Sequence, residues 1–214
     1  MNYVIESFLY LIPSFIICTI YLAIKEYTSI RKNRKVTWFH RCTSLIFGLY
    51  LTFIFSITIS PVFGFHIIPT FNQINIKPFD VLETIHINPT NFYGNIIVFM
   101  PIGFLAVFLS KKCNKLFFTA FLGMSISLLI EFIQLFEHRG TDIDDIMLNT
   151  LGTVLGYIVA KIFLFVLPSL RLKIGLTERG NNTLSLGGEQ NLVLLTILVL
   201  FSVMMTGFRF RTGF

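Results

Sequence analysis

Residues 130–152 read "IEFIQLFEHRGTDIDDIMLNTLG", a stretch that joins the end of one apolar segment to the start of the next. Glu131 stands inside the first apolar segment. The second segment opens with three aspartates, which are Asp142, Asp144 and Asp145. A charged side chain at the centre of a membrane-spanning helix costs roughly 2.5–3.5 kcal/mol on insertion scales. Carboxylates in such surroundings therefore indicate either a structural contact between helices or a functional site.

The composition around this stretch is that of a membrane protein. Of the 214 residues, 54% are hydrophobic, 15% aromatic and only 13% charged, whereas soluble domains carry about 25% charged residues. The apolar residues also form blocks close to the ~20 residues that a helix needs to cross a bilayer. The blocks are residues 8–24, 42–60, 92–110, 116–136, 146–167 and 192–207.

These blocks predict an all-α, polytopic transmembrane helix bundle that forms a single integral-membrane domain over residues 1–214. Six helices are expected, or five if the last and shortest block does not span. The first residues lack the basic region and the cleavage site of a secretory signal peptide, so the first block is expected to remain as a helix.

Lysine and arginine collect in alternate loops. The basic stretches are residues 25–41, 111–115 and 171–179. The loops 61–91 and 137–145 hold one basic residue each, Lys77 and Arg139. This is the positive-inside pattern, which predicts that the N-terminus and these two loops lie outside the cytoplasm. Arg209 and Arg211 would then lie outside as well, against the rule.

The same loops account for the net charge of +6, so the bilayer is the expected partner and nucleic acid is not. The three cysteines are Cys18, Cys42 and Cys113. Their spacing matches no metal motif, and none falls in a predicted outer loop. We therefore expect no disulfide, no bound metal and no cofactor.

Four polar residues are predicted to lie at one level near the outer surface. In this topology Asn95 lies near the outer end of the third helix, and Asn149 lies just inside the fifth. Glu131 and Gln134 lie near the outer end of the fourth helix, with Glu131 about 7–8 Å below that end at 1.5 Å per residue. We predict that the four side chains line one outward-facing cavity.

The helical period places these polar residues on narrow faces. One face of the fourth helix holds Ser127, Glu131, Gln134 and His138. One stripe of the fifth helix holds Asp142, Asp145, Asn149, Gly152 and Gly156. Glycines at that spacing let another helix approach closely. Both faces are therefore predicted to point into the bundle rather than towards lipid.

The acidic turn has structural and functional explanations. Thr141 and Asp144 have the spacing of a capping box, and acids favour a helix N-terminus, so one or two of the aspartates are expected to be caps. Glu131 and the two amides also fit plain hydrogen bonds between helices. The remaining acids lie beside Arg139, which could pair with them or bind an anionic headgroup or pyrophosphate. A divalent cation held by the carboxylates is a third alternative, which the lack of His or Cys ligand spacing disfavours.

The predicted outer loop is amphipathic and long for a connection between helices. Over residues 61–89 it contains His66, Asp80, Glu83 and His86. It is expected either to lie along the outer membrane interface or to form a re-entrant or capping element over the bundle. Solvated loop polarity is the simplest explanation of its charged residues.

Three stretches together resemble the VanZ-like family of membrane proteins. They are "NIIVFMPIGFL" (95–105), "SLLIEFIQLF" (127–136) and "RGTDIDDIMLNTLGTVLGY" (139–157). The resemblance is concentrated in residues 91–167, with a weaker part at "IKPFDVLETI" (76–85). The matching positions are Asn95, Pro101, Gly103, Glu131, Gln134, Arg139, Asp142, Asp145, Asn149, Thr150 and Gly152.

The resemblance implies a multi-pass protein of the bacterial cytoplasmic membrane. The family's namesake lowers susceptibility to teicoplanin-type glycopeptide antibiotics. The candidate ligand-binding residues are Asn95, Glu131, Gln134, Arg139, Asp142, Asp145 and Asn149. If the protein catalyses a reaction, the candidate catalytic residues are Glu131, Asp142 and Asp145.

Three hypotheses about function remain. The first is a non-enzymatic protein that acts at the outer leaflet on lipid-linked cell-wall precursors or their complexes with the antibiotic. The second is an intramembrane enzyme for a lipid-linked substrate, with Glu131 as general acid or base. The sequence favours the first, because it shows neither a Ser/His/Asp nor a Cys/His arrangement. A transporter is disfavoured, because the polar residues lie on one side of the membrane midplane.

Overall fold

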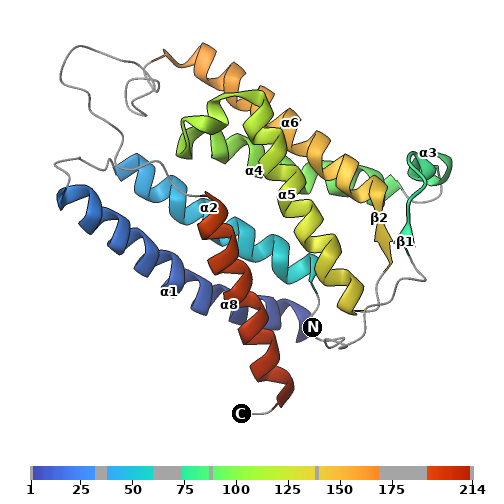
Figure 1. Ribbon diagram of the computed structural model, residues 1–214, viewed down its shortest axis with the longest axis horizontal. Helices are drawn as coiled ribbons and strands as arrows, with labels where there is room; N and C mark the ends of the chain where they lie inside the picture. Colours follow the sequence, from blue (N-terminus) through green and yellow to red (C-terminus); the bar gives the residue numbers. More distant parts are fainter. Residues whose placement is uncertain are drawn as a thin grey trace.

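Six long helices form the bundle in a computed structural model that describes residues 2–31, 38–59, 74–86, 89–137, 140–168 and 192–212 (Figure 1). They are α1 (Asn2–Arg31), α2 (Trp38–Thr58), α4 (Pro89–Leu109), α5 (Leu116–Gln134), α6 (Ile143–Val166) and α8 (Leu192–Thr212). Each helix contains most of one of the apolar blocks of the sequence, and the predicted all-α bundle is confirmed.

Four of these helices, α2, α4, α5 and α6, are long and apolar enough to cross a membrane. In α1 and α8 the apolar stretches found among the described residues are shorter, Ile12–Lys25 and Leu192–Met204. Large apolar side chains are exposed on all six helices, among them Ile97 at 62% and Phe165 at 78%. Water does not favour such a surface, so these side chains are suited to face lipid.

α2 lies at the centre of the largest group of buried side chains. Phe47, Leu51, Ile54 and Phe55 of this helix are completely buried. They belong to one apolar cluster with side chains of α1, α4, α5 and α8. Because α4 and α5 belong to this cluster, the core holds both helices, and so the polar residues they carry, against α2.

α4 packs against α6 through glycines, which is the close approach that the glycine stripe predicted. A Cβ added at Gly152 would overlap the main-chain oxygen of Ile96, and one added at Gly156 would overlap that of Met100. From the other side, a Cβ at Gly103 would overlap the main-chain oxygen of Thr153. The two backbones therefore touch directly and leave no room for a side chain at these positions.

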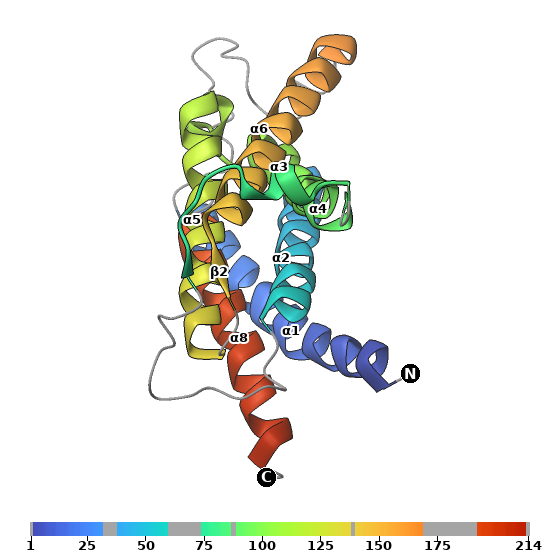
Figure 2. The same cartoon turned by 90° about the vertical axis from the view of Figure 1, so that its right-hand side faces the viewer.

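Small elements between the long helices come together at one end of the bundle. β1 (Ile74–Asn75) pairs in parallel with β2 (Thr141–Asp142), and Asn75 lies opposite Asp142. The short helix α3 (Asp80–Thr84) follows β1. Figure 2 turns this end towards the viewer and shows α3 next to α4 and β2 next to α5. The described part of the predicted outer loop thus lies against this end of the bundle, as a capping element would; His66 lies outside the described residues.

The two ends of the bundle differ in charge. α5 follows Lys115 and carries Glu131 in its last turn, while α6 starts at the aspartates and carries Lys161 near its other end. Between α4 and α5 lies the short helix η3 (Lys112–Asn114), and η4 (Leu135–Glu137) follows α5. The acidic end is defined by Glu131, Asp142, Asp144 and Asp145. The lysine end is defined by Lys111, Lys112, Lys115 and Lys161.

We predict that Gly152→Ala destabilises the protein by about 1–3 kcal/mol, because the added methyl group forces α4 away from α6. Thermal unfolding of the purified protein in detergent measures the effect. Gly94→Ala in α4 is the matched control, since nothing lies within 4 Å of an added Cβ there. Equal unfolding temperatures for Gly152→Ala and the wild type would contradict the close contact.

Candidate functional site

Glu131 organises the turn between α5 and α6. One carboxylate oxygen, Oε2, accepts a hydrogen bond from the main-chain N–H of Asp142 at 3.1 Å. The hydroxyl of Thr141 donates to the main-chain oxygen of Glu131 at 3.3 Å. The Glu131 side chain is only 4% exposed. A buried carboxylate therefore fixes the position of β2 at the acidic end.

Asp142 begins α6 and also holds β1. Its Oδ1 accepts from the N–H of Asp144 at 2.9 Å, which makes Asp142 the N-cap of α6. Its Oδ2 accepts from the side-chain amide of Asn75 at 3.2 Å. The predicted capping box, with Thr141 as its N-cap, is therefore wrong: the N-cap is the next residue, Asp142. Thr141 lies in β2, and its hydroxyl donates to the main-chain oxygen of Glu131.

Asp144 caps a different helix from the one in which it lies. Its Oδ1 accepts from the N–H of Phe79 at 2.6 Å, and its Oδ2 accepts from the N–H of Val81 at 2.8 Å. These N–H groups lie at the start of α3, where Phe79 has a φ of 70°. Asp144 is 2% exposed. Two of the three aspartates are thus caps, as expected, but only one of them caps α6.

Asn75 joins β1 to this group, and sequence reasoning missed it. Its Oδ1 accepts from the N–H of Lys77 at 3.1 Å, an Asx turn. Its amide nitrogen lies 3.3 Å from Asp80 Oδ2 as well as 3.2 Å from Asp142 Oδ2. The only local signal was an asparagine two residues before Lys-Pro, which indicates a turn but no partner on another helix.

Two asparagines connect the three helices of the site. Asn95 of α4 donates to Asp145 Oδ1 of α6 at 2.5 Å. Asn149 of α6 donates to the hydroxyl of Ser127 of α5 at 2.9 Å. Asn149 is 5% exposed, and its side-chain oxygen is buried without a hydrogen-bond partner in the described structure. That oxygen is an acceptor that a ligand or a water molecule could use.

Gln134 lies at the same end but points to another helix. Its amide donates to the main-chain oxygen of Thr58 in α2 at 3.0 Å. Ser127, Glu131 and Gln134 are all buried, so the predicted inward face of this helix is confirmed where it is described. His138 and Arg139 lie outside the described residues. The shared outward-facing cavity remains a prediction; the cavity described below is lined by none of the four residues.

The chemistry of the acidic end is that of hydrogen-bond acceptors. Carboxylates of Glu131, Asp142 and Asp144 accept from main-chain N–H groups, a bond in which the ionised oxygen is a strong acceptor. Within the described ranges, no group of three or more His, Cys, Asp or Glu side chains is placed to hold a metal ion. The arrangement thus orients the backbone of three segments and leaves the buried oxygen of Asn149 available.

A comparison with family models finds a match to the family described as VanZ/LLP1 over residues 42–164, more than half of the chain. The chain belongs to the VanZ/LLP1 family. The matched region contains all seven candidate ligand-binding residues, and the predicted VanZ-like membrane protein is confirmed. Searches of curated proteins and of solved structures returned no match.

In this VanZ/LLP1 protein we predict that Asp144→Asn destabilises the capping element. An amide has one acceptor oxygen, so one of the two N–H groups at the start of α3 loses its partner, at a cost of about 1–3 kcal/mol. Hydrogen exchange at the N–H groups of Phe79 and Val81 should become faster. Glu83→Gln makes the same acid-to-amide change on an exposed side chain of α3 and should leave the exchange unchanged. Unchanged exchange in Asp144→Asn would contradict the capping role.

Proposed function

We propose that this protein lowers susceptibility to teicoplanin-type glycopeptide antibiotics. In this proposal it acts without catalysis at the outer leaflet of the bacterial cytoplasmic membrane, on lipid-linked cell-wall precursors or on their complexes with the antibiotic. One observation supports it above the others: Asn95, Asp145 and Asn149, all within the family match, lie together at the acidic end of the bundle.

The charge of the two ends supports an outward-facing site. Lys111, Lys112 and Lys115 lie at the opposite end from Glu131. Lysine-rich ends of membrane helices remain on the cytoplasmic side. The acidic end then faces the outer leaflet, where cell-wall precursors and antibiotics meet.

The acceptors at this end suit a ligand rich in O–H and N–H donors, such as a sugar or a peptide. Asp145 is only half-buried, and the oxygen of Asn149 lies deeper. A donor group that enters beside Asp145 could therefore reach a buried acceptor and replace the hydrogen bonds it makes in water.

The role of Glu131 favours binding over catalysis. Its carboxylate already accepts from the main chain of Asp142 and holds the turn between α5 and α6. A general base must instead be within hydrogen-bond reach of the proton that it removes from the substrate. We therefore propose that the charge of Glu131 serves ligand binding rather than a reaction.

We predict that Asp145→Asn abolishes protection against teicoplanin, because it removes the charge but keeps an acceptor for Asn95. Glu131→Gln should do the same, although its amide oxygen can still accept from Asp142. The inhibitory concentration of teicoplanin, measured in a susceptible strain that expresses each variant, should return to that of cells without the protein.

Glu83→Gln is the matched control at the same end, because Glu83 is exposed, and it should protect like the wild type. Immunodetection in isolated membranes checks that all variants accumulate equally. If Asp145→Asn and Glu131→Gln both protect fully at equal abundance, the two carboxylates are scaffolding and the proposed site is wrong.

We predict the orientation of the bundle from the same charges. In a background without the three native cysteines, a cysteine at position 140 should react with a membrane-impermeant maleimide on intact cells. A cysteine in place of Lys111 should react only after the cells are permeabilised. Gly140 and Lys111 are both exposed, so access to the reagent decides the result. The reverse pattern would place the acidic end in the cytoplasm and contradict the proposal.

A further inference from the structure

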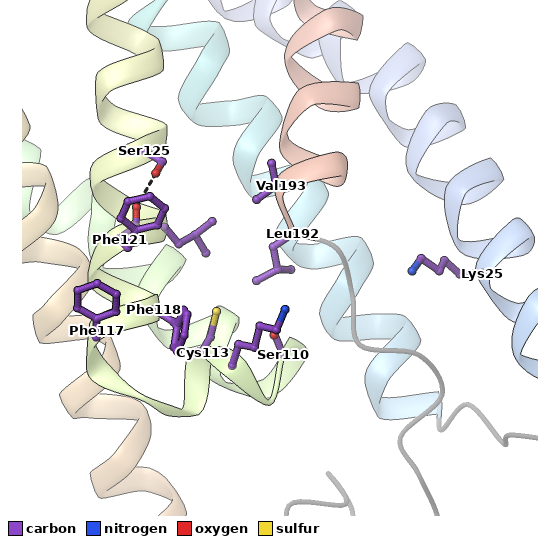
Figure 3. A pocket seen from close by; sticks show the side chains of 11 residues that line it. Lys25, Ser110, Cys113, Phe117, Phe118, Phe121, Ser125, Leu192 and Val193 are labelled. Carbon is purple, nitrogen blue, oxygen red and sulfur yellow. Dashed lines mark hydrogen bonds between the residues drawn. The ribbon is translucent and has the colours of Figure 1, made fainter.

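A cavity of about 640 Å³ lies at the lysine end, away from the proposed site. Its lining residues are Lys25, Ser110, Lys112, Cys113, Phe117, Phe118, Phe121, Leu122, Ser125, Leu192 and Val193. Figure 3 shows the cavity between the first turns of α5 on one side and the start of α8 on the other. The volume falls within the roughly 300–1,000 Å³ that is usual for ligand pockets.

The wall of the cavity is mostly apolar, and part of it is exposed at the surface of the bundle. Cys113, Leu122 and Leu192 are buried and form its inner part, while Phe117 is 73% exposed and Val193 is 59% exposed. In a bundle that spans a membrane, exposed aromatic and aliphatic side chains of α5 and α8 meet the acyl chains of one leaflet. The opening therefore leads to lipid rather than to the interior of the bundle.

The charge of the cavity is positive. Among the described residues that line it, two are lysines, Lys25 and Lys112, and none is acidic. Figure 3 shows the side chain of Lys25 extending from α1 towards this space. The two hydroxyls, of Ser110 and Ser125, are uncharged, and that of Ser125 donates to the main-chain oxygen of Phe121. A ligand that complements this wall has a long apolar part and an anionic head.

We propose that the cavity binds one anionic glycerophospholipid from the leaflet at the lysine end. Its phosphate contacts the ammonium groups of Lys25 and Lys112, and an acyl chain lies along Phe117, Phe118 and Phe121. Lysine binds phosphate as a point charge, and a basic group beside an anionic leaflet strengthens binding by a factor of about five. This site is independent of the function proposed for the acidic end.

Native mass spectrometry of the full-length protein in detergent tests the proposal. Dioleoylphosphatidylglycerol should bind with one tight site, and dioleoylphosphatidylcholine should bind more weakly. The double variant Lys25→Gln with Lys112→Gln, which substitutes both lining lysines, should weaken the binding of phosphatidylglycerol by about 25-fold. The matched control, Lys111→Gln with Lys115→Gln, removes the same charge from exposed positions outside the cavity and should bind like the wild type.

Ser125→Trp separates the cavity from general surface charge, because it places a bulky ring in the cavity and keeps both lysines. It should lose the tight site while the unfolding temperature stays close to that of the wild type. Inorganic phosphate in excess should not displace the lipid, since the acyl chain holds it.

Three results would overturn the proposal. Equal binding of phosphatidylcholine would show that the cavity does not distinguish an anionic headgroup from a zwitterionic one. Equal weakening by the control pair would show general attraction to the lysine end. A wild-type protein that retains no lipid would show that another part of the chain fills the cavity. If Ser125→Trp fails to fold, the two pairs of lysine variants still decide the question.

Discussion

The direct contact between the backbones of α4 and α6 is the constraint on which the acidic end depends. Gly152 and Gly156 let the main chain of α4 lie against α6 at Ile96 and Met100. Asn95, next to Ile96, then comes within 2.5 Å of Asp145. A side chain at either glycine would separate the helices and also break this polar link. Packing and polar chemistry at this end therefore share one cause.

The carboxylates of the acidic end serve mainly the backbone. Glu131, Asp142 and Asp144 each accept from a main-chain N–H of a turn or a helix start. An unpaired N–H that is shielded from water costs free energy, so these acids stabilise irregular chain where no ladder or helix supplies an acceptor. Near a membrane surface, this gives a compact connection between spanning helices.

The sequence was sufficient to predict the helices and the faces that they bury, because span length and the helical period are local properties. It could not reveal which neighbour each polar side chain meets. Gln134 and Asn149 were placed at one depth, yet Gln134 bonds to α2 and Asn149 to α5. Depth follows from position in the chain, whereas the partner follows from how helices rotate against one another. The bonds of Asp144 to Phe79 and Val81 were likewise beyond local patterns.

The link between Asp144 and the start of α3 has a consequence for biosynthesis. Its two partners, Phe79 and Val81, precede it by 65 and 63 positions in the chain. At about 5–20 residues per second, translation of the intervening chain takes on the order of 3–13 seconds. Until Asp144 has been synthesised, the start of α3 lacks its acceptor and β1 has no strand to pair with. The acidic end is therefore completed only after α4 and α5 have been made, so translation itself sets the order of assembly.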